Sequence, residues 1–143
     1  MSKRAPKTKR TPSPQFHGAN LAGARFSDAD LSRAELFNTA LTGARLEDVD
    51  LRGAKIDNVN LAKLKLSDAD LRGATIENAN LSRATVRDVD LSRVVLQDAN
   101  LSGARLRDVD LSRVRIEDAR IEGLVIDGVR VDKLIEAARN RRR

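Results

Sequence analysis

Residues 79–103 decide the fold, and they read ANLSR ATVRD VDLSR VVLQD ANLSG when they are divided into units of five. The middle residue of each unit is Leu or Val, and the first residue is Ala or Val. The same pattern extends from Phe16 to Val131, where all 24 positions spaced by five are Leu, Ile, Val or Phe. The positions two residues earlier hold 13 Ala, seven Val, two Leu, Thr39 and Pro14. Each unit therefore supplies one large and one smaller apolar side chain.

A period of five residues fits neither a helix nor a continuous strand. It drifts off one face of a 3.6-residue helix within two units. Side chains in a strand alternate with period two, so an odd period requires a turn in every repeat. The pattern predicts a coil of short straight edges with a corner in each unit, and with both apolar side chains of each edge turned inward.

Acidic and amide residues add a second period, of 20 residues. Asp fills positions 28, 48, 68, 88 and 108, whereas Asn fills positions 38, 58 and 78. Asp also fills positions 30, 50, 70, 90 and 110, whereas Asn fills positions 20, 60, 80 and 100. Stacked equivalents recur once per coil, so four edges make a coil. The repeat then forms six coils, about 29 Å long at the ~4.8 Å spacing of neighbouring strands. The Asn pairs Asn58/Asn60 and Asn78/Asn80 are expected to form amide ladders.

The uninterrupted units resemble those of the pentapeptide-repeat family, which follow the pattern A(D/N)LXX. Close matches are residues 29–33 (ADLSR), 79–83 (ANLSR) and 99–103 (ANLSG), and the resemblance covers residues 14–133. It implies an all-β fold, a right-handed quadrilateral parallel β-helix (β-solenoid), with the large and small apolar residues pointing inward. It also implies a bacterial protein that is not an enzyme and that acts as a rod-like scaffold for protein interaction.

The formal net charge of +6 is unevenly distributed along the chain. Residues 1–15 carry +5 without any acid, residues 16–131 carry −2, and residues 132–143 carry +3. This distribution suggests, as an alternative function, weak nucleic-acid binding through the two basic tails. The first segment is expected to be a disordered arm that solubilises the protein or binds nucleic acid or an anionic surface by electrostatics. It contains no aromatic residue to stack on bases. Its candidate residues are Lys3, Arg4, Lys7, Lys9 and Arg10.

The repeat gives way to a predicted helix in residues 132–143. Asp132 is expected to be the N-cap, and the Ala-rich sequence that follows favours a helix. Leu134, Ile135 and Ala138 are expected either to lie over the last coil as a cap or to contact a second copy in a homodimer. The N-terminal end shows no equivalent cap. The three expected segments are therefore the basic arm at 1–15, the β-helix at 16–131 and the helix with its basic tail at 132–143.

The ten aspartates should stack along one edge of the solenoid, where like charges disfavour each other unless they are compensated. Turn hydrogen bonds and flanking cations could compensate them, in which case the ladder is structural. The alternative is an acidic stripe for a protein partner. The resemblance adds a specific version of this alternative, because family members that protect DNA gyrase and topoisomerase IV look like DNA through acidic surfaces. The candidate ladder is Asp28, Asp30, Asp48, Asp50, Asp68, Asp70, Asp88, Asp90, Asp108 and Asp110, and the flanking cations are Arg25, Arg45, Lys65, Arg87, Arg105, Arg33, Arg52, Arg72, Arg93 and Arg113.

Composition argues against a catalytic, cofactor or metal site. The chain has no Cys and only one His, His17, so thiol chemistry, Cys-ligated zinc and His-based sites are not expected. No nucleophile–base pair or Gly-rich phosphate loop can be assembled. Calcium needs six to eight converging oxygens, whereas the Asp pairs line an extended edge. No apolar run is long enough to span a membrane, so a cytoplasmic protein is expected.

Overall fold

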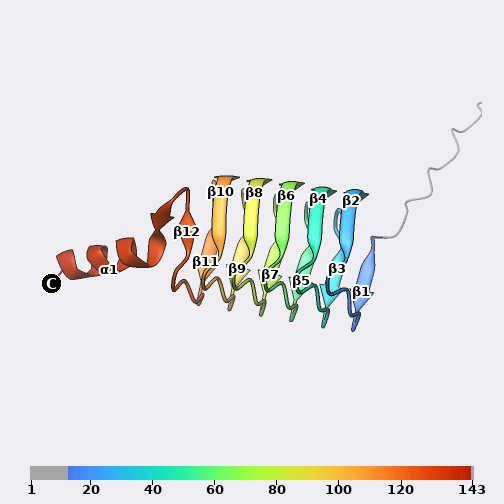
Figure 1. The fold of residues 1–143 in the computed structure, drawn as a ribbon, viewed down its shortest axis with the longest axis horizontal. Coiled ribbons are helices and arrows are strands. Elements are labelled where there is room, and N and C mark those ends of the chain that lie inside the picture. The colour runs from blue at the N-terminus through green and yellow to red at the C-terminus, as the bar shows by residue number, and fades with distance from the viewer. Residues whose placement is uncertain (1–12, 143) are drawn as a thin grey trace, which may run out of the picture.

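The computed structural model describes residues 13–142, which form a parallel β-helix followed by one helix (Figure 1). The candidate arm residues Lys3, Arg4, Lys7, Lys9 and Arg10 lie outside the described residues. One sheet contains β1 (Gln15–His17), β3 (Glu35–Phe37), β5 (Lys55–Asp57), β7 (Thr75–Glu77), β9 (Val95–Gln97) and β11 (Arg115–Glu117). The other contains β2 (Arg25–Asp30), β4 (Arg45–Asp50), β6 (Lys65–Asp70), β8 (Thr85–Asp90), β10 (Arg105–Asp110), β12 (Val125–Ile126) and β13 (Val129–Arg130).

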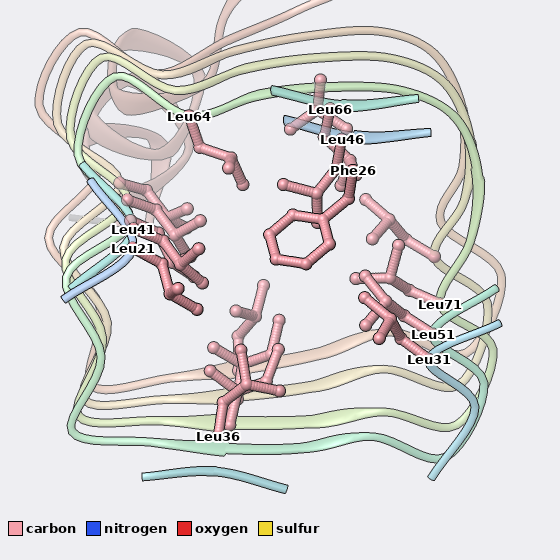
Figure 2. A pocket seen from close by; sticks show the side chains of 18 of the residues that line it. Leu21, Phe26, Leu31, Leu36, Leu41, Leu46, Leu51, Leu64, Leu66 and Leu71 are labelled. Carbon is pink, nitrogen blue, oxygen red and sulfur yellow. The ribbon is translucent and has the colours of Figure 1, made fainter. Parts of the chain in front are cut away.

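Successive coils stack in a register of 20 residues, as the sequence predicts. Leu36 aligns with Ile56 across β3 and β5, and Leu46 aligns with Leu66 across β4 and β6. A further wall is held by single parallel bridges at Asn20, Ala40, Asn60, Asn80, Asn100 and Arg120. The cross-section is close to square (Figure 2). These observations confirm the predicted family fold, a β-solenoid with four edges per coil.

A left-handed backbone conformation turns the chain at every corner. Each fifth residue from Gly18 to Gly128 has a positive φ, with values such as 51° at Asp28 and 59° at Arg33. This conformation costs most L-residues roughly 1–2 kcal/mol, whereas Gly, Asn and Asp tolerate it better. Alternate corners differ in composition. The corners at residue 18 and at every tenth residue up to 128 hold only Gly, Asp or Asn, whereas those at residue 23 and at every tenth residue up to 123 hold Gly, Arg or Lys. At the second kind, a turn closes by a backbone hydrogen bond, such as that from Ala34 N to Leu31 O at 3.0 Å.

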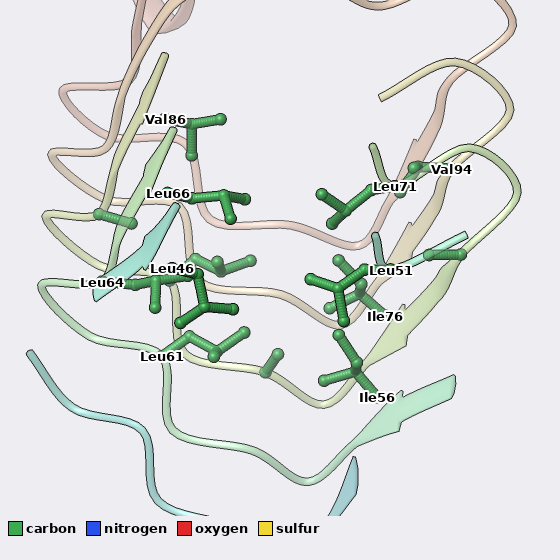
Figure 3. Close-up of a cluster of buried hydrophobic side chains, with 14 of the residues drawn as sticks. Leu46, Leu51, Ile56, Leu61, Leu64, Leu66, Leu71, Ile76, Val86 and Val94 are labelled. Carbon is green, nitrogen blue, oxygen red and sulfur yellow. The ribbon is translucent and has the colours of Figure 1, made fainter. Parts of the chain in front are cut away.

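The interior is a continuous stack of apolar side chains. Leu51 is 3% exposed and Val94 is fully buried, and both belong to one cluster that runs through the coils (Figure 3). Ala and Val alike fit the small position, since Val49 and Ala44 are equally enclosed by their neighbours. A narrow apolar channel of about 70 Å³ remains along the axis between the stacked leucines (Figure 2). An apolar space of this kind stays dry, so the interior offers no polar binding site.

Two aromatic residues fill the interior of the first coil, and no element precedes β1 among residues 13–142. The rings of Phe16 and Phe26 meet edge to face, with their centroids 6.3 Å apart, and both are half-buried against the core. Figure 2 shows Phe26 pointing into the interior. These aromatic rings fill the centre of the first coil and cover part of the stack behind them. Strand β1 begins at Gln15, one residue before the predicted start of the β-helix.

The C-terminal end also differs from the prediction. Strand β12 pairs with β13 in an antiparallel hairpin, whose two-residue loop, Asp127 and Gly128, has positive φ at both positions. This is the geometry of a type I′ turn, which an Asp-Gly pair favours. The 24th predicted unit is replaced by the start of α1 (Val131–Arg141), whose first residue, Val131, still packs against the core.

Helix α1 neither begins nor packs as predicted. Its N-cap is Arg130, in an extended conformation, whereas Asp132 lies inside the first turn and accepts a hydrogen bond from Gly123 N at 3.0 Å. The helix buries none of its residues and projects away from the last coil (Figure 1). Leu134 is 58% exposed and Ile135 is 38% exposed, so the prediction that they lie over the last coil is wrong. The hairpin is the reason, because it sets the direction in which the helix leaves.

Gly43 tests the role of the left-handed corners. Its φ is +68°, and no atom lies within 4 Å of a Cβ placed on it, so only backbone conformation opposes a side chain there. We expect Gly43→Ala to lower the free energy of unfolding by about 1 kcal/mol, and Gly43→Asn to lower it less. Thermal unfolding followed by circular dichroism measures both. Thr42→Ala, at the neighbouring residue without a positive φ, is the control; equal effects of Ala and Asn at position 43 would contradict the account.

Candidate functional site

The ten candidate aspartates form two parallel columns rather than one ladder. The wall column lies on a wall of the solenoid, one residue before each large apolar residue, and consists of Asp30, Asp50, Asp70, Asp90 and Asp110. The corner column lies at left-handed corners, with φ between 50° and 55°, and consists of Asp28, Asp48, Asp68, Asp88 and Asp108. The two columns hold Asp for different physical reasons.

Each aspartate of the wall column completes a turn. Its Oδ1 accepts a hydrogen bond from the backbone N–H two residues later, at 3.0 Å for Asp30 and Ser32 and at 2.8 Å for Asp110 and Ser112. On the amide-rich wall, Asn60 does the same for the N–H of Ala62. Asp and Asn are thus interchangeable for this local bond, and the choice between them decides only the charge that the surface carries.

Two arginines bridge neighbouring coils within the wall column. Arg72 Nη2 donates to Asp70 Oδ2 at 2.6 Å, and Arg72 Nε lies 3.7 Å from Asp90 Oδ2. Arg52 repeats the arrangement one coil earlier, 2.7 Å from Asp50 and 4.0 Å from Asp70. The hydrogen bonds from these guanidinium groups lower the pKa of Asp50 and of Asp70. The expected compensation by cations is therefore present at Asp50, Asp70 and Asp90, whereas Asp30 and Asp110 are bonded to Ser32 and Ser112 instead.

The corner column is less engaged. Arg87 pairs with Asp88 at 3.2 Å and Arg107 with Asp108 at 3.4 Å. Within residues 13–142, Asp28, Asp48 and Asp68 have no cationic group within 4.0 Å. A shallow groove of about 470 Å³ separates the two columns in the second and third coils. The left-handed φ explains why Asp occupies these corners, but it leaves their carboxylates exposed to solvent.

Most of the expected flanking cations do not neutralise the aspartates. Of those that precede the Asp pairs, only Arg87 forms an ion pair in the described part of the chain, because the others point outward three residues before the corner. Of those that follow, Arg33, Arg93 and Arg113 occupy left-handed corners instead. The unpaired members of the first group are Arg25, Arg45, Lys65 and Arg105.

The predicted amide ladder is present only in part. Asn58 Nδ2 donates to Asn38 Oδ1 in the next coil, and Asn78 Nδ2 donates to Asp57 Oδ1 at 3.0 Å. Asn60 and Asn80 instead use their Oδ1 atoms for their own turns. The Asn residues at the corners therefore bond to a neighbouring coil, whereas those two residues later bond within their own turn, as the wall aspartates do.

The remaining surface offers little catalytic chemistry. No group of three or more His, Cys, Asp or Glu is arranged to hold a metal ion among the described residues. His17 is exposed and its ring lies 5.2 Å from that of Phe37. No helix in the described part of the chain is both long and apolar enough to cross a membrane.

Two family models match this chain. One, described as a pentapeptide repeat region, matches residues 44–121, and the other, pentapeptide repeats in eight copies, matches residues 15–53. A comparison with curated protein sequences found no significant match.

The chain is also similar to solved structures. One is a pentapeptide repeat protein (Rfr23) from the cyanobacterium Cyanothece 51142, with 26% identity over 79% of this chain and 91% of that chain and a TM-score of 0.40. Another, from the thylakoid lumen of Arabidopsis thaliana, has 28% identity over 85% and 76% and a TM-score of 0.45. A third is QnrB1, a plasmid-mediated fluoroquinolone resistance protein, with 18% identity over 87% and 85% and a TM-score of 0.42.

The Arg72–Asp70 pair gives a pH-dependent prediction. Because the folded-state pKa of Asp70 is lowered, the pair stabilises the fold above the unfolded-state pKa of about 3.9 and ceases to do so as the pH falls through the lower folded-state value. We expect Arg72→Ala to raise the pKa of Asp70, measured by carboxyl NMR titration. It should also lower the free energy of unfolding slightly near neutral pH, a difference that fades below about pH 4 as Asp70 becomes protonated.

Lys55→Ala is the matched control, because Lys55 is an exposed strand cation on another wall, without an ion pair among the described residues. An Asp70 pKa that stays the same in Arg72→Ala would show that the contact does not form in solution.

Proposed function

Because this chain belongs to the pentapeptide repeat family, we propose that it acts without catalysis as a rigid rod that binds a protein partner through its outer columns. The observation that carries this proposal is the corner column, where Asp28, Asp48 and Asp68 lie in register without a cationic partner among residues 13–142. A bacterial, cytoplasmic setting, which the sequence analysis expects, stays a prediction.

The backbone supports a binding role for this column. Left-handed corners fix the direction of each Cβ, and the strands on both sides of the corner are paired with their neighbours in the next coil. A surface that is already ordered loses little conformational entropy on binding. Carboxylates in such a row attract and orient a partner that presents basic side chains.

DNA gyrase or topoisomerase IV is a second, more specific candidate partner. The observation that favours it is the regular row of exposed negative charge along the corner column, which resembles the row of phosphates that these enzymes bind. The neutralised wall column beside it limits the net negative charge of this face. This candidate therefore rests on the corner column alone.

The C-terminal helix is proposed to pair with a second copy of the chain. Val131, Leu134, Ile135 and Ala138 follow the i, i+3, i+4, i+7 spacing that places side chains on one face of a helix. Leu134 and Ile135 are exposed in the single chain, as is Val129 in the preceding strand. The same stripe on a second copy of the chain provides an apolar surface of matching length. A dimer would present two corner columns to the protein that binds them.

Neutralising the corner column tests the scaffold proposal. The variant Asp28→Asn, Asp48→Asn, Asp68→Asn keeps a residue that tolerates positive φ and removes three charges. We expect it to fold normally and to lose at least tenfold in affinity for the partner captured by the wild-type chain. Pull-down from cell extract identifies that partner, and titration with the purified partner measures the affinity. Gyrase supercoiling with added protein tests the second candidate directly.

The control is Asp57→Asn, Glu77→Gln, Glu117→Gln, which removes the same charge from another wall. Equal partner affinity in the wild type and the corner variant would overturn the proposed role of this column. If micromolar protein does not change supercoiling by gyrase, gyrase is excluded as the partner. The pull-down then still tests whether another protein binds the corner column.

Sedimentation tests the proposed pairing. We expect the wild-type chain to sediment as a dimer at micromolar concentration, and Leu134→Glu, Ile135→Glu to sediment as a monomer with unchanged circular dichroism of the β-helix. Lys133→Gln, Asn140→Glu changes the charge by the same amount on the opposite face of α1, so it is the control and should remain dimeric. A wild-type chain that is monomeric at every concentration would contradict the pairing.

A further inference from the structure

We propose that a ridge of cations on the folded body binds the phosphate backbone of duplex nucleic acid. The ridge runs along the corner and wall edge that lead into the long strands, over five coils. It is a surface distinct from the corner column, and it lies in the described body rather than in the N-terminal arm. We define the cation ridge as Arg25, Arg45, Lys63, Lys65, Arg83 and Arg105.

The backbone holds these residues in two adjacent columns. Arg25, Arg45 and Lys65 align with one another across β2, β4 and β6, and Arg105 continues the column beyond Thr85. Lys63 and Arg83 occupy the left-handed corner two residues earlier, with φ of 59° and 58°. Neighbouring strands are about 4.8 Å apart, so the ridge spans about 19 Å.

The ridge cations are unpaired. No carboxylate within residues 13–142 lies within 4.0 Å of any of them, whereas Arg87 and Arg107, on the far side of the same wall, pair with corner aspartates. All six side chains are exposed to solvent. Like charges stacked in register repel each other. A bound row of phosphates would relieve this repulsion and release its own counterions.

The surface beside the ridge is shaped to let a polyanion approach. A shallow groove of about 510 Å³ lies along the ridge in the middle coils, and its lining includes Ala62, Ser82, Ser102 and Gly103. These residues are small and uncharged, so they neither block nor repel a sugar–phosphate backbone. Glu122 lies at the C-terminal end of the groove, where it would disfavour phosphate and so confine binding to the first five coils.

The length and chemistry of the ridge fit duplex rather than single-stranded nucleic acid. Duplex DNA carries one negative charge per ~1.7 Å of helix axis, so a duplex that lies along 19 Å of the ridge has about 11 phosphates over that length, and those on its near side can contact the cations. Single-strand binders also stack bases on aromatic side chains. The three aromatic residues of the chain lie elsewhere, because Phe16 and Phe26 fill the first coil and Phe37 lies on β3. No base-reading element borders the ridge, so binding should be independent of sequence.

The test measures binding of the full chain to a labelled 20-base-pair duplex by fluorescence anisotropy over a range of salt concentrations. We expect Arg45→Gln, Lys65→Gln, Arg83→Gln to weaken binding at least tenfold at about 50 mM salt. Removing three phosphate contacts should also reduce the slope of log K against log salt by about 2.7. The substituted side chains are exposed, and circular dichroism checks that the fold is retained.

The control is Arg93→Gln, Arg113→Gln, Arg115→Gln, which removes the same charge from the opposite side of the coil and likewise includes left-handed corners. It should retain affinity within about threefold of the wild type. If both variants lose the same affinity for the duplex, binding depends on the net charge of the protein and not on the cation ridge, and the proposal is overturned. Loss of all duplex binding on deletion of residues 1–12, or binding to anionic vesicles or to single strands without binding to the duplex, would also overturn it.

Discussion

The left-handed conformation of every fifth residue is the constraint on which the rest of this structure depends. Each such residue turns the chain from one short edge to the next, and four turns return it to the same wall one coil later. Only then can the large apolar residues stack through the interior and the backbone pair between coils. Corners rather than loops therefore fix where every outward side chain lies, and equivalent residues form columns along the rod.

Those columns explain how a solenoid with an apolar interior can present charged groups on its outer surface. Wall aspartates accept hydrogen bonds from backbone N–H groups in their own turns, and those in the middle coils also contact the bridging arginines Arg52 and Arg72. Of the corner aspartates, Asp28, Asp48 and Asp68 have no cationic partner among residues 13–142, whereas Asp88 and Asp108 pair with arginines. Cations such as Arg45 and Lys65 align on the other side of the wall without partners in the described body. The solenoid thus carries negative and positive side chains on different edges. The negative edge suits a basic protein partner, and the positive edge suits a nucleic acid.

The sequence predicts the solenoid well, because period and register are local properties repeated many times. The spacing of Leu and Ala gives the edges, and the Asp positions 20 residues apart give the coil. The difference between Asp28 and Asp30 is not visible in the sequence, since only the backbone shows that one is a corner and the other closes a turn. The exposure of Leu134 follows from the hairpin at Asp127 and Gly128, a type I′ signal that was present in the sequence.

The most direct test of the central claim is an NMR measurement of φ at the corners. Positive φ shortens the distance between the amide and α protons of one residue, so it gives a strong intraresidue cross-peak. The account predicts this signature at every non-glycine corner, including cationic corners such as Arg93, and its absence at the non-glycine residues between the corners, apart from Asp127 in the terminal hairpin. Negative φ at Arg93 or at the aspartate corners would contradict it, because the coil could not then close in this register.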